Sequence, residues 1–273
     1  MAALDEDSIK AWIVPYLSTA KRGTKLQVEV SEIVSAILYR LKTGCPWREL
    51  PVKAFFGEQQ ISWQGVYHHF RKWTNDGSFR KVWVSLLTEH RRLVDLSSVQ
   101  LDGSQTICMN GGACVSYQKR KAANSCNSLF LADDQGLLLA MSPPMAGAHH
   151  DLYQIEQVIR ELCQLLEEAG IAVEGLFVNA DAGFDSAGFR KACSALRIEA
   201  NIDLNPRNGQ SGDGYVYFDE ELFKRRKVIE HAFAWIDSFK ALLIRFETRV
   251  ETWMALHFLA FATLFIRKFK RKT

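Results

Sequence analysis

Apolar residues recur at helical spacing through the first 96 residues of the chain, between short polar or proline-containing segments. An apolar residue at every third or fourth position is the pattern of an amphipathic helix. This pattern predicts helices over residues 5–17, 28–41, 62–74 and 79–92. Gly44 is a stop signal after the second helix, and Ser62 and Ser78 stand at the expected N-caps of the third and fourth. We therefore expect an all-α, helix-turn-helix-like region at the N-terminus.

The predicted helix over residues 62–74 has an apolar face and a polar face. The positions expected to face the core are Trp63, Val66, Phe70 and Trp73. The outward positions carry amide, imidazole, guanidinium and ammonium groups and are Gln64, His68, Arg71 and Lys72. Such groups can contact base edges and phosphates, which is what a helix in the DNA major groove needs. An ordinary solvated helix face is an equally good interpretation.

Beyond residue 96 the pattern changes to alternating strands and helices. Strands are predicted over 99–104, 113–117, 128–132, 137–142, 176–178 and 197–202, helices over 151–168, from 186 onward and over 223–237, and a polar loop at 205–214. In the first strand Gln100, Asp102 and Ser104 share one face, because side chains alternate along a strand. The run 176–178 is continuously apolar, which indicates a strand covered on both faces. This order predicts a mixed α/β architecture.

The last predicted helix, Phe223 to Asp237, carries a carboxylate on a partly apolar face. Successive residues of a helix are about 100° apart, so six residues fall on one face, within one third of the circumference: Phe223, Arg226, Glu230, Phe233, Ala234 and Asp237. A carboxylate between apolar groups is expected to be held rigidly and partly dehydrated, which suits a metal ligand. The adjacent face carries Lys224, Arg225 and Lys227 and suits a phosphate backbone. The alternative is an amphipathic surface helix with one glutamate near the edge of its core face.

Two aspartates are candidate partners for this glutamate. Asp102 lies on the first predicted strand, and Asp181 follows the buried strand at 176–178. Ligand sites in such sheets lie beyond the carboxyl ends of the strands, where Asp181 is expected. The carboxylates of Asp102, Asp181 and Glu230, converging at one sheet edge, would form a hard-oxygen site for Mg²⁺ or Mn²⁺. Two such ions about 4 Å apart can activate an attacking oxygen and stabilise a leaving oxygen in phosphoryl transfer.

Other polar residues have simpler interpretations. Four aspartates are interpreted as turn or helix-cap residues, because aspartate is common there: Asp133, Asp134, Asp185 and Asp203. The cluster of His149, His150 and Asp151 suggests zinc, but Asp151 precedes an apolar helix and is predicted to be its N-cap. A supporting catalytic role for this cluster is the less favoured alternative.

Composition sets the class of protein without deciding its partner. Of the 273 residues, 48% are hydrophobic and 24% are charged, as in soluble globular proteins. The net charge of +3 does not by itself indicate nucleic acid, although cations cluster at 119–121, 224–227 and 267–272. The 6 cysteines form no C-x-x-C pair and no zinc-finger spacing, so free thiols in the cytosol are expected. The longest apolar run, 253–266, is too short for a bilayer and predicts a buried helix, with no membrane partner.

These motifs together resemble the bacterial insertion-sequence transposases of the DDE type, in the branch with a short, uninterrupted catalytic domain and a Tyr-Arg-Glu-Lys signature. The similar blocks are Gly44 to Pro51, Val66 to Trp83, Leu101 to Ser104, Gly147 to Asp151, Ala180 to Ser186, and Arg226 to Glu230 with Phe233, Trp235, Phe239 and Arg245. Each block is short, but their shared order and spacing make the combination specific.

The resemblance implies an RNase H-like mixed sheet flanked by helices and preceded by the all-α region. It implies two domains, residues 1–96 for binding DNA ends and residues 97–273 for catalysis. Asp102, Asp181 and Glu230 would be the catalytic residues and would hold two Mg²⁺ ions, for which Mn²⁺ can substitute. Arg226 would contact phosphates of the transposon end.

The same resemblance implies a DNA transposase that hydrolyses the phosphodiester at the element end. The freed 3′-hydroxyl would then attack target DNA. Its partners would be double-stranded DNA, at the element ends and at the target, and a second copy of the chain in a synaptic homodimer. It would be a cytoplasmic bacterial protein, associated with the nucleoid when bound to DNA.

Two residues depart from the signature. Phe223 stands where the signature has Tyr, which removes a hydroxyl that could reach a phosphate. Asp237 stands where it has Lys, which replaces a cation by an anion that repels DNA locally. These departures leave open a catalytically impaired, transposase-derived DNA-binding protein as the alternative. A general metal nuclease, without preference for particular ends, is a third interpretation.

Overall fold

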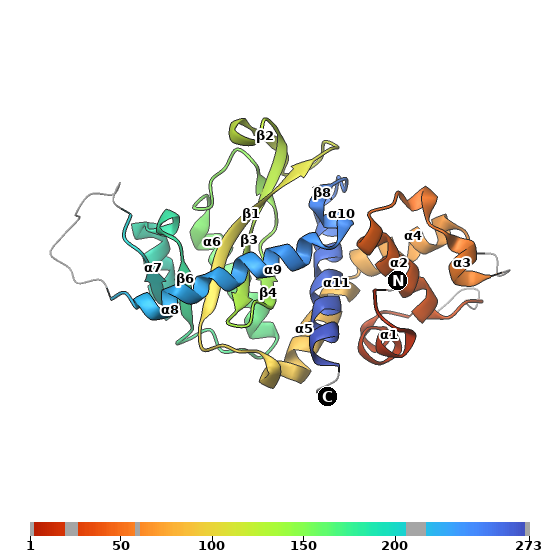
Figure 1. Cartoon of the computed structure of the whole chain (residues 1–273), viewed down its shortest axis with the longest axis horizontal. Helices are drawn as coiled ribbons and strands as arrows, with labels where there is room; N and C mark the ends of the chain where they lie inside the picture. Colours follow the sequence, from red (N-terminus) through yellow and green to blue (C-terminus); the bar gives the residue numbers. More distant parts are fainter. Residues whose placement is uncertain (1–2, 20–26, 58–60, 206–216, 271–273) are drawn as a thin grey trace. The chain divides into compact units, whose positions relative to one another are not determined.

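The computed structural model of the chain describes residues 3–19, 27–57, 61–205 and 217–270 (Figure 1). Of the predicted polar loop at 205–214, all but Asn205 lies outside these residues. The chain forms two compact units. Unit 1 consists of residues 1–89, 109–113 and 235–273, and unit 2 of residues 90–108 and 114–234. The two ends of the chain therefore belong to the same unit.

The first helices of unit 1 begin and end at residues with clear capping geometry. They are α1 (Glu6–Trp12), η1 (Val14–Tyr16), α2 (Val30–Thr43), η2 (Trp47–Glu49), α3 (Val52–Phe56), α4 (Trp63–Asn75) and α5 (Ser78–His90), where η denotes a 3₁₀ helix. Asp5 is the N-cap of α1, and its carboxylate accepts the Ser8 N–H at 2.9 Å. Gly44 ends α2 with a φ of 70°, a left-handed conformation that glycine adopts without strain. The predicted stop at Gly44 is confirmed.

Some predicted boundaries in this region are wrong. The first helix ends at Trp12, because Pro15 cannot continue an α-helix and lies in η1 instead. Helices η2 and α3 occupy a stretch that was expected to be a proline-containing linker. Ser78 is not the cap of α5. Ser78 is the first residue of that helix, and the Asp76 carboxylate accepts its N–H at 3.0 Å and its hydroxyl at 2.6 Å.

The rest of unit 1 comes from the end of the chain. It contains α10 (Lys240–Leu243), the short strand β8 (Ile244–Arg245) and α11 (Val250–Phe269). α11 packs against α2 and α4. The rings of Trp12 in α1 and Phe265 in α11 lie 6.3 Å apart, and a buried ion pair of 2.8 Å joins Arg40 of α2 to Glu247. The N-terminal helices therefore share one core with the C-terminal helix.

Helix α11 contains the apolar run predicted at 253–266. Within the described ranges it is the one helix that is long and apolar enough to cross a membrane, but 72% of its apolar window is buried inside the protein. Trp253, Phe261 and Phe265 are among its buried side chains. The prediction of a buried helix is confirmed.

Unit 2 is built on a mixed sheet. Its strands are β1 (Val99–Cys108), β2 (Ser116–Gln118), β3 (Ala123–Asp133), β4 (Leu138–Met141), β5 (Met145–Ala146), β6 (Phe177–Ala180) and β7 (Glu199–Ile202). Their order is β2-β3-β1-β6-β7, and β4 and β5 also pair with β3. β3 is antiparallel to β1, whereas β1, β6 and β7 are parallel to one another. The parallel strands end at the same edge of the sheet.

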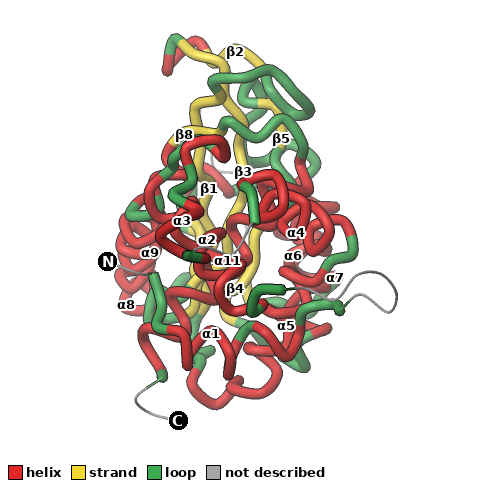
Figure 2. The backbone as a smooth tube through the Cα atoms, turned by 90° about the vertical axis from the view of Figure 1, so that its right-hand side faces the viewer, coloured by secondary structure: helices red, strands yellow, loops and turns green. Residues whose placement is uncertain are grey.

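Helices lie on both sides of this sheet (Figure 2). On one side are α6 (Ile155–Glu168) and α7 (Ala187–Ala195), and on the other α8 (Glu220–Lys224), η7 (Arg225–Lys227) and α9 (Val228–Asp237). The 3₁₀ helices η3 (Arg91–Leu93), η4 (Lys119–Lys121) and η5 (Ala182–Phe184) lie in connecting segments. The predicted mixed α/β architecture is confirmed.

The boundary expected near residue 96 stays a prediction about which stretch binds DNA ends and which performs the chemistry. The compact units are assembled differently, because residues 109–113 and 235–273 join the N-terminal helices. Helix α9 itself begins in unit 2 and continues into unit 1 from Trp235.

Candidate active site

Asp102 lies on β1, on the face of the sheet that α9 covers. Its partner in the β1–β3 register is Phe130, whose ring packs against Phe233 of α9 with centroids 5.5 Å apart. The Asp102 side chain is 17% exposed, and its Oδ1 accepts the N–H of Gly103 at 2.8 Å. This carboxylate is therefore largely removed from water.

Asp181 is the corresponding residue of the neighbouring strand. Strands β1 and β6 pair at Gln100 and Asn179, and continuing this parallel register by two residues sets Asp102 beside Asp181. Asp181 follows β6 directly and is the N-cap of η5, where its Oδ1 accepts the N–H of Gly183 at 2.8 Å. The predicted position of Asp181, just beyond the carboxyl end of a buried strand, is confirmed.

The pKa of the Asp102 carboxyl is raised from 3.8 to about 6. Burial is the largest cause, because a low-dielectric environment disfavours the charged form. The negative charges of Asp181 and Glu230 raise this pKa further, whereas the Gly103 N–H and the Arg226 guanidinium lower it. Asp181 and Glu230 thus both lie within electrostatic reach of Asp102. In the part of the chain that the structure describes, no three His, Cys, Asp or Glu side chains are arranged to hold a metal ion, so their role as ligands stays a prediction.

Glu230 differs from what the sequence led us to expect. The helix predicted from Phe223 to Asp237 is divided by η7 into α8 and α9. The buried side of α9 is formed by Ile229, Ala232 and Ile236, and Glu230 is exposed. The expected dehydration of Glu230 is therefore wrong, because α9 turns a different stripe of residues toward the core. The dehydrated carboxylate of this site is Asp102.

Arg226 is held against the Asp102 carboxylate. Its Nη1 donates to Asp102 Oδ2 at 3.1 Å, and both side chains are mostly buried. The guanidinium also lies over the ring of Phe223, 6.0 Å from the centroid, and that ring packs against Phe218 at 5.0 Å. Phe223 therefore supports Arg226 from α8 through its ring face.

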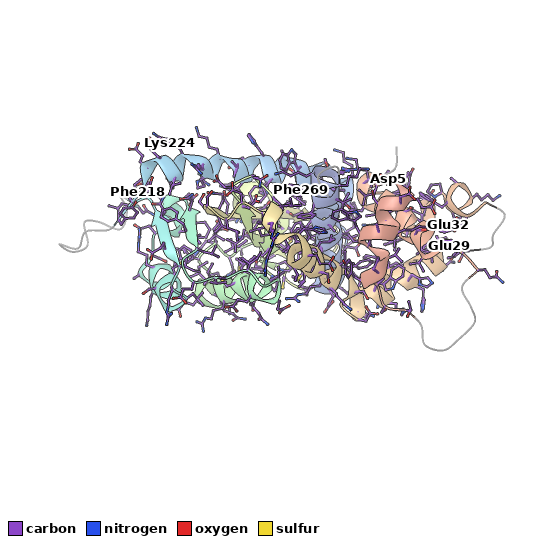
Figure 3. All side chains as sticks on the ribbon, turned by 90° about the horizontal axis from the view of Figure 1, so that it is seen from below. Asp5, Glu29, Glu32, Phe218, Lys224 and Phe269 are labelled. Carbon is purple, nitrogen blue, oxygen red and sulfur yellow. The ribbon has the colours of Figure 1, made fainter. Side chains whose placement is uncertain are left out.

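The cations next to Arg226 are exposed but differ in their partners. Lys224, at the outer surface of α8 (Figure 3), pairs with Glu221 at 2.6 Å. Arg225 pairs with Asp134 at 2.8 Å. Lys227 is exposed and forms no ion pair with any residue that the structure describes. Of the predicted cationic face, Lys227 is thus the side chain most readily available to an external anion.

A row of buried amide side chains crosses three strands beneath α8. Gln100 on β1, Asn179 on β6 and Asn201 on β7 are at most 1% exposed. Asn179 Nδ2 donates to Gln100 Oε1 at 2.9 Å, and Asn201 Nδ2 donates to Asn179 Oδ1 at 2.8 Å. We call these three residues the amide ladder. Buried amides need such partners, because leaving them unpaired costs free energy.

The amide ladder also holds the start of α8. Asn179 Nδ2 donates to the Leu222 carbonyl at 3.0 Å, and Asn201 Nδ2 donates to that of Asp219, the N-cap of α8, at 2.9 Å. The Asp219 N–H donates back to Asn201 Oδ1 at 2.8 Å. The ladder thereby fixes the segment that leads to Arg226 against the strands of the two aspartates.

Sequence reasoning missed the amide ladder. Its signal was a single amide between apolar residues in each parallel strand, as in Val178-Asn179-Ala180. A polar residue inside an otherwise apolar, buried strand must find a hydrogen-bond partner within the fold. That signal could have identified the three positions, although not the carbonyl groups of α8 that they bind.

In unit 1, the predicted outward face of α4 is only half confirmed. Gln64 and His68 are exposed. Arg71 and Lys72 are half-buried. The Arg71 Nη1 donates to the hydroxyl of Tyr67 at 3.4 Å, and the Lys72 Nζ donates to the carbonyl oxygen of Ser18 at 3.1 Å. Gln64 and His68 therefore form the freely accessible part of the predicted DNA-binding face.

Asp151 is not the N-cap of the helix that follows it. α6 begins at Ile155, and its N-cap residue is Gln154 in a left-handed conformation. The Asp151 Oδ1 instead accepts the side-chain N–H of Asn127, on β3, at 2.6 Å. The capping prediction failed because a tertiary contact takes the carboxylate that the helix would have used.

The two histidines before Asp151 also have local partners. The ring of His149 stacks on Tyr153 with centroids 3.6 Å apart. His150 Nδ1 accepts the N–H of Leu152 at 3.1 Å. These contacts fit a turn between β5 and α6 better than a zinc site.

Family comparisons agree with this architecture. A family model described as "DDE superfamily endonuclease" matches residues 95–265, which is more than half of the chain. The chain therefore belongs to the DDE superfamily of endonucleases and is a nuclease-type enzyme. A second model, described as "Putative transposase of IS4/5 family", matches residues 8–83, so the N-terminal helices are similar to those of that family. No curated protein matches the chain.

Solved transposase structures resemble the chain despite low sequence identity. The piggyBac transposase in a synaptic complex with hairpin DNA is 10% identical with a TM-score of 0.53, over 98% of this chain and 73% of that chain. The catalytic domain of the Mos1 mariner transposase is 12% identical with a TM-score of 0.30, over 76% of this chain and 93% of that chain. The Mos1 paired-end complex with Mn is 12% identical with a TM-score of 0.32, over 90% of this chain and 80% of that chain. The fold is RNase H-like, with an N-terminal all-helical region, as the resemblance implied.

Proposed function

We propose that the chain binds the ends of an insertion sequence and cleaves the phosphodiester there with divalent cations. The freed 3′-hydroxyl then attacks target DNA through the same site. The observation that carries this proposal is the partly buried Asp102 carboxylate in electrostatic contact with Asp181 and Glu230. Three carboxylates from three separate elements concentrate negative charge at one place, which is an arrangement that a divalent cation stabilises.

The side chains present fit Mg²⁺ or Mn²⁺ by their chemistry. Carboxylate oxygens are hard ligands of the kind these ions prefer. Asp102, Asp181 and Glu230 would hold two Mg²⁺ ions, for which Mn²⁺ can substitute. Such ions would supply the Lewis acidity that activates a water oxygen and stabilises the leaving oxygen of a phosphodiester. Neutralising the other two carboxylates would also lower the pKa of Asp102 toward its ordinary value.

Arg226 would change partner when DNA binds. Its guanidinium now pairs with Asp102 at 3.1 Å and is supported by the ring of Phe223. Guanidinium groups bind phosphate in the same forked geometry that they use for carboxylates. Arg226 would therefore pass from Asp102 to a phosphate of the transposon end. Because Phe223 supports Arg226 through its ring, this contact does not need the hydroxyl of the signature Tyr.

The remaining DNA contacts follow from exposure and charge. Backbone contacts are proposed for Lys224 and Lys227, base-edge contacts for Gln64 and His68, and additional positive charge for Arg71 and Lys72. Arg71 and Lys72 are half-buried, so they would act mainly through the electrostatic field of α4. The end and the target would both be double-stranded DNA.

We further infer the assembly and location from the chemistry. Joining two element ends in one complex requires two active sites, so a homodimer is expected on DNA. A DNA-cutting enzyme of this kind would work in the bacterial cytoplasm, bound to the nucleoid.

The experiment that tests this function is cleavage of duplex DNA carrying the element ends, which the inverted repeats flanking the gene would identify. In Mg²⁺, Asp102→Asn, Asp181→Asn and Glu230→Gln should each reduce cleavage by about 100-fold or more while end binding persists. Asp203→Asn is the matched control, since the exposed Asp203 follows β7 as Asp181 follows β6.

Each other outcome has a distinct meaning. Undiminished cleavage by Asp102→Asn would rule out the assigned triad. End binding without cleavage, by a folded wild-type protein in Mg²⁺ or Mn²⁺, would support a transposase-derived DNA-binding protein. Cutting without preference for the ends would support a general metal nuclease.

A further inference from the structure

Gly103 follows Asp102 on β1, and the space where its side chain would be is occupied. Side chains alternate along a strand, so a Cβ on Gly103 would point to the face of the sheet opposite Asp102. That Cβ would lie 2.3 Å from Asp151 Oδ1 and 2.8 Å from Asp151 Cγ. Real Cβ atoms do not come this close to other heavy atoms. The Asp151 carboxyl therefore lies directly against the backbone of β1, behind Asp102.

A buried amide holds the Asp151 carboxyl in this place. Asn127 Nδ2 donates to Asp151 Oδ1 at 2.6 Å, and Asn127 is fully buried on β3. Asn127 is the register partner of Gln105, which lies two residues beyond Gly103 and on the same face of β1. The contact between Asp151 and Gly103 is thus fixed from the neighbouring strand.

The segment before Asp151 is also fastened to this face of the sheet. A Cβ on Gly147 would lie 2.0 Å from Ser125 Oγ, so this backbone too is pressed against β3. The Gly147 N–H donates to the Ser125 carbonyl at 3.0 Å, and the Gly147 carbonyl accepts Gln118 Nε2 at 2.9 Å. The Ala148 N–H donates to Ser116 Oγ at 2.7 Å. Asp151 therefore approaches β1 from a well-anchored segment.

Gly103 connects Asp151 to the active-site carboxylate. Its N–H donates to Asp102 Oδ1 at 2.8 Å, while the space for a Cβ on its other face is filled by the Asp151 carboxyl group. A shift of β1 at Gly103 would move the N–H that orients Asp102. Helix capping does not account for Asp151, because α6 begins at Ile155 with Gln154 at its N-cap.

We propose that Asp151 is a positioning residue: packed against the side-chain-free Gly103, it sets the backbone that orients the Asp102 carboxylate for metal binding. This inference rests on the proposed function, because it assumes that Asp102 is a metal ligand. Asp151 acts through the volume of its carboxyl group and the hydrogen bond from Asn127. Its charge is not required, since it faces away from Asp102.

A double-mutant cycle between Gly103 and Asp151 tests this coupling. The variants are Asp151→Ala, Gly103→Ala, the two combined, and Asp151→Asn. Gly111→Ala is the matched control, because a Cβ on Gly111 would meet nothing within 4 Å. For each protein, Mn²⁺ binding is measured from the electron paramagnetic resonance signal of free Mn²⁺. The thermal unfolding midpoint and the affinity for end DNA are measured alongside.

We expect Asp151→Ala and Gly103→Ala each to weaken Mn²⁺ binding at least tenfold, with end-DNA affinity within twofold of wild type. In the combined variant the new methyl group occupies the space that the carboxyl group has left. It should therefore bind Mn²⁺ at least threefold more tightly than Gly103→Ala alone, a departure from additivity that reports direct contact. Asp151→Asn keeps the volume and an acceptor oxygen, and should stay within threefold of wild type, as should Gly111→Ala.

Other results would overturn the positioning role. Unchanged Mn²⁺ binding together with a lowered unfolding midpoint would mean that Asp151 serves stability alone. Equal loss in Asp151→Asn and Asp151→Ala would mean that its charge matters. If Asp151→Ala does not fold, Asp151→Ser replaces it in the cycle, and additive losses would again contradict the coupling. A folded wild type that binds no Mn²⁺ would instead refute the proposed function, and the positioning role with it.

Discussion

Replacing Asn179 by alanine would cut the amide ladder at its centre. Asn179 makes three hydrogen bonds, donating to Gln100 Oε1 and to the Leu222 carbonyl and accepting from Asn201 Nδ2. All three amides are buried, and the ladder is the link between α8 and the strands that carry Asp102 and Asp181. The substitution should therefore lower the free energy of unfolding and disturb the site at once.

The size of the effect follows from the partners that are left behind. A buried polar group that loses its partner costs about 1–3 kcal/mol. Gln100 Oε1 would lose Asn179, its hydrogen-bond partner in the ladder, whereas Asn201 Nδ2 keeps its bond to the Asp219 carbonyl. The Leu222 carbonyl belongs to a half-buried residue and can turn to water. We therefore expect a loss of about 1–3 kcal/mol, most of it from Gln100 Oε1.

Urea denaturation followed by circular dichroism measures this loss. Asn124→Ala is the control, because Asn124 is an exposed residue of β3 and its loss should cost less than about 0.5 kcal/mol. The loss of unfolding free energy expected for Asn179→Ala is a sizeable part of the roughly 5–15 kcal/mol that stabilises a typical protein. A difference below about 1 kcal/mol between the two variants would refute the argument that the ladder anchors α8.

Further predictions concern charge. Burial lowers the pKa of His257 from 6.5 to about 4, because the fold favours the neutral ring. The stability that this ring contributes is full above pH 6.5 and falls as the pH drops toward 4. His257→Gln should make the urea midpoint depend less on pH between pH 7 and 4.5. Burial raises the pKa of Asp102 from 3.8 to about 6, so the fold loses stability as the pH rises from 3.8 to 6 and stays weakened above that. With EDTA present, Asp102→Asn should therefore unfold at a higher temperature than wild type at pH 8, and a difference between the two midpoints that does not narrow toward pH 4 would contradict this. Arg226→Gln should weaken end binding, measured by fluorescence anisotropy, and reduce the salt dependence of binding by about one phosphate contact. An unchanged slope of log affinity against log salt concentration would exclude the proposed change of partner of Arg226.

Local rules predicted the elements whose ends are determined by neighbouring residues. The stop of α2 at Gly44 and the start of α4 at Ser62 follow from capping, and both were recognisable in the sequence. The strand that leads to Asp181 was predictable because a short apolar run ends there. The same kind of argument identified α11 as buried.

Tertiary contacts account for what the sequence did not predict. The carboxylate of Asp151 is bound by Asn127 and therefore does not cap α6. The ammonium of Lys72 is bound by the Ser18 carbonyl, so it is not part of an open DNA-binding face. The orientation of α9 depends on which stripe the sheet buries, and periodicity alone assigned Glu230 to the wrong environment. In each case the partner is distant along the chain.

The core that α11 completes has a consequence for the timing of synthesis. The helices that leave the ribosome first cannot complete their core until the end of the chain has been made, because Trp12 packs on Phe265 of α11 and Arg40 pairs with Glu247, which precedes α11. Domains usually fold as they emerge, but this unit has to wait. A chain released early by the ribosome would therefore lack the part of the core that α11 supplies to α2 and α4.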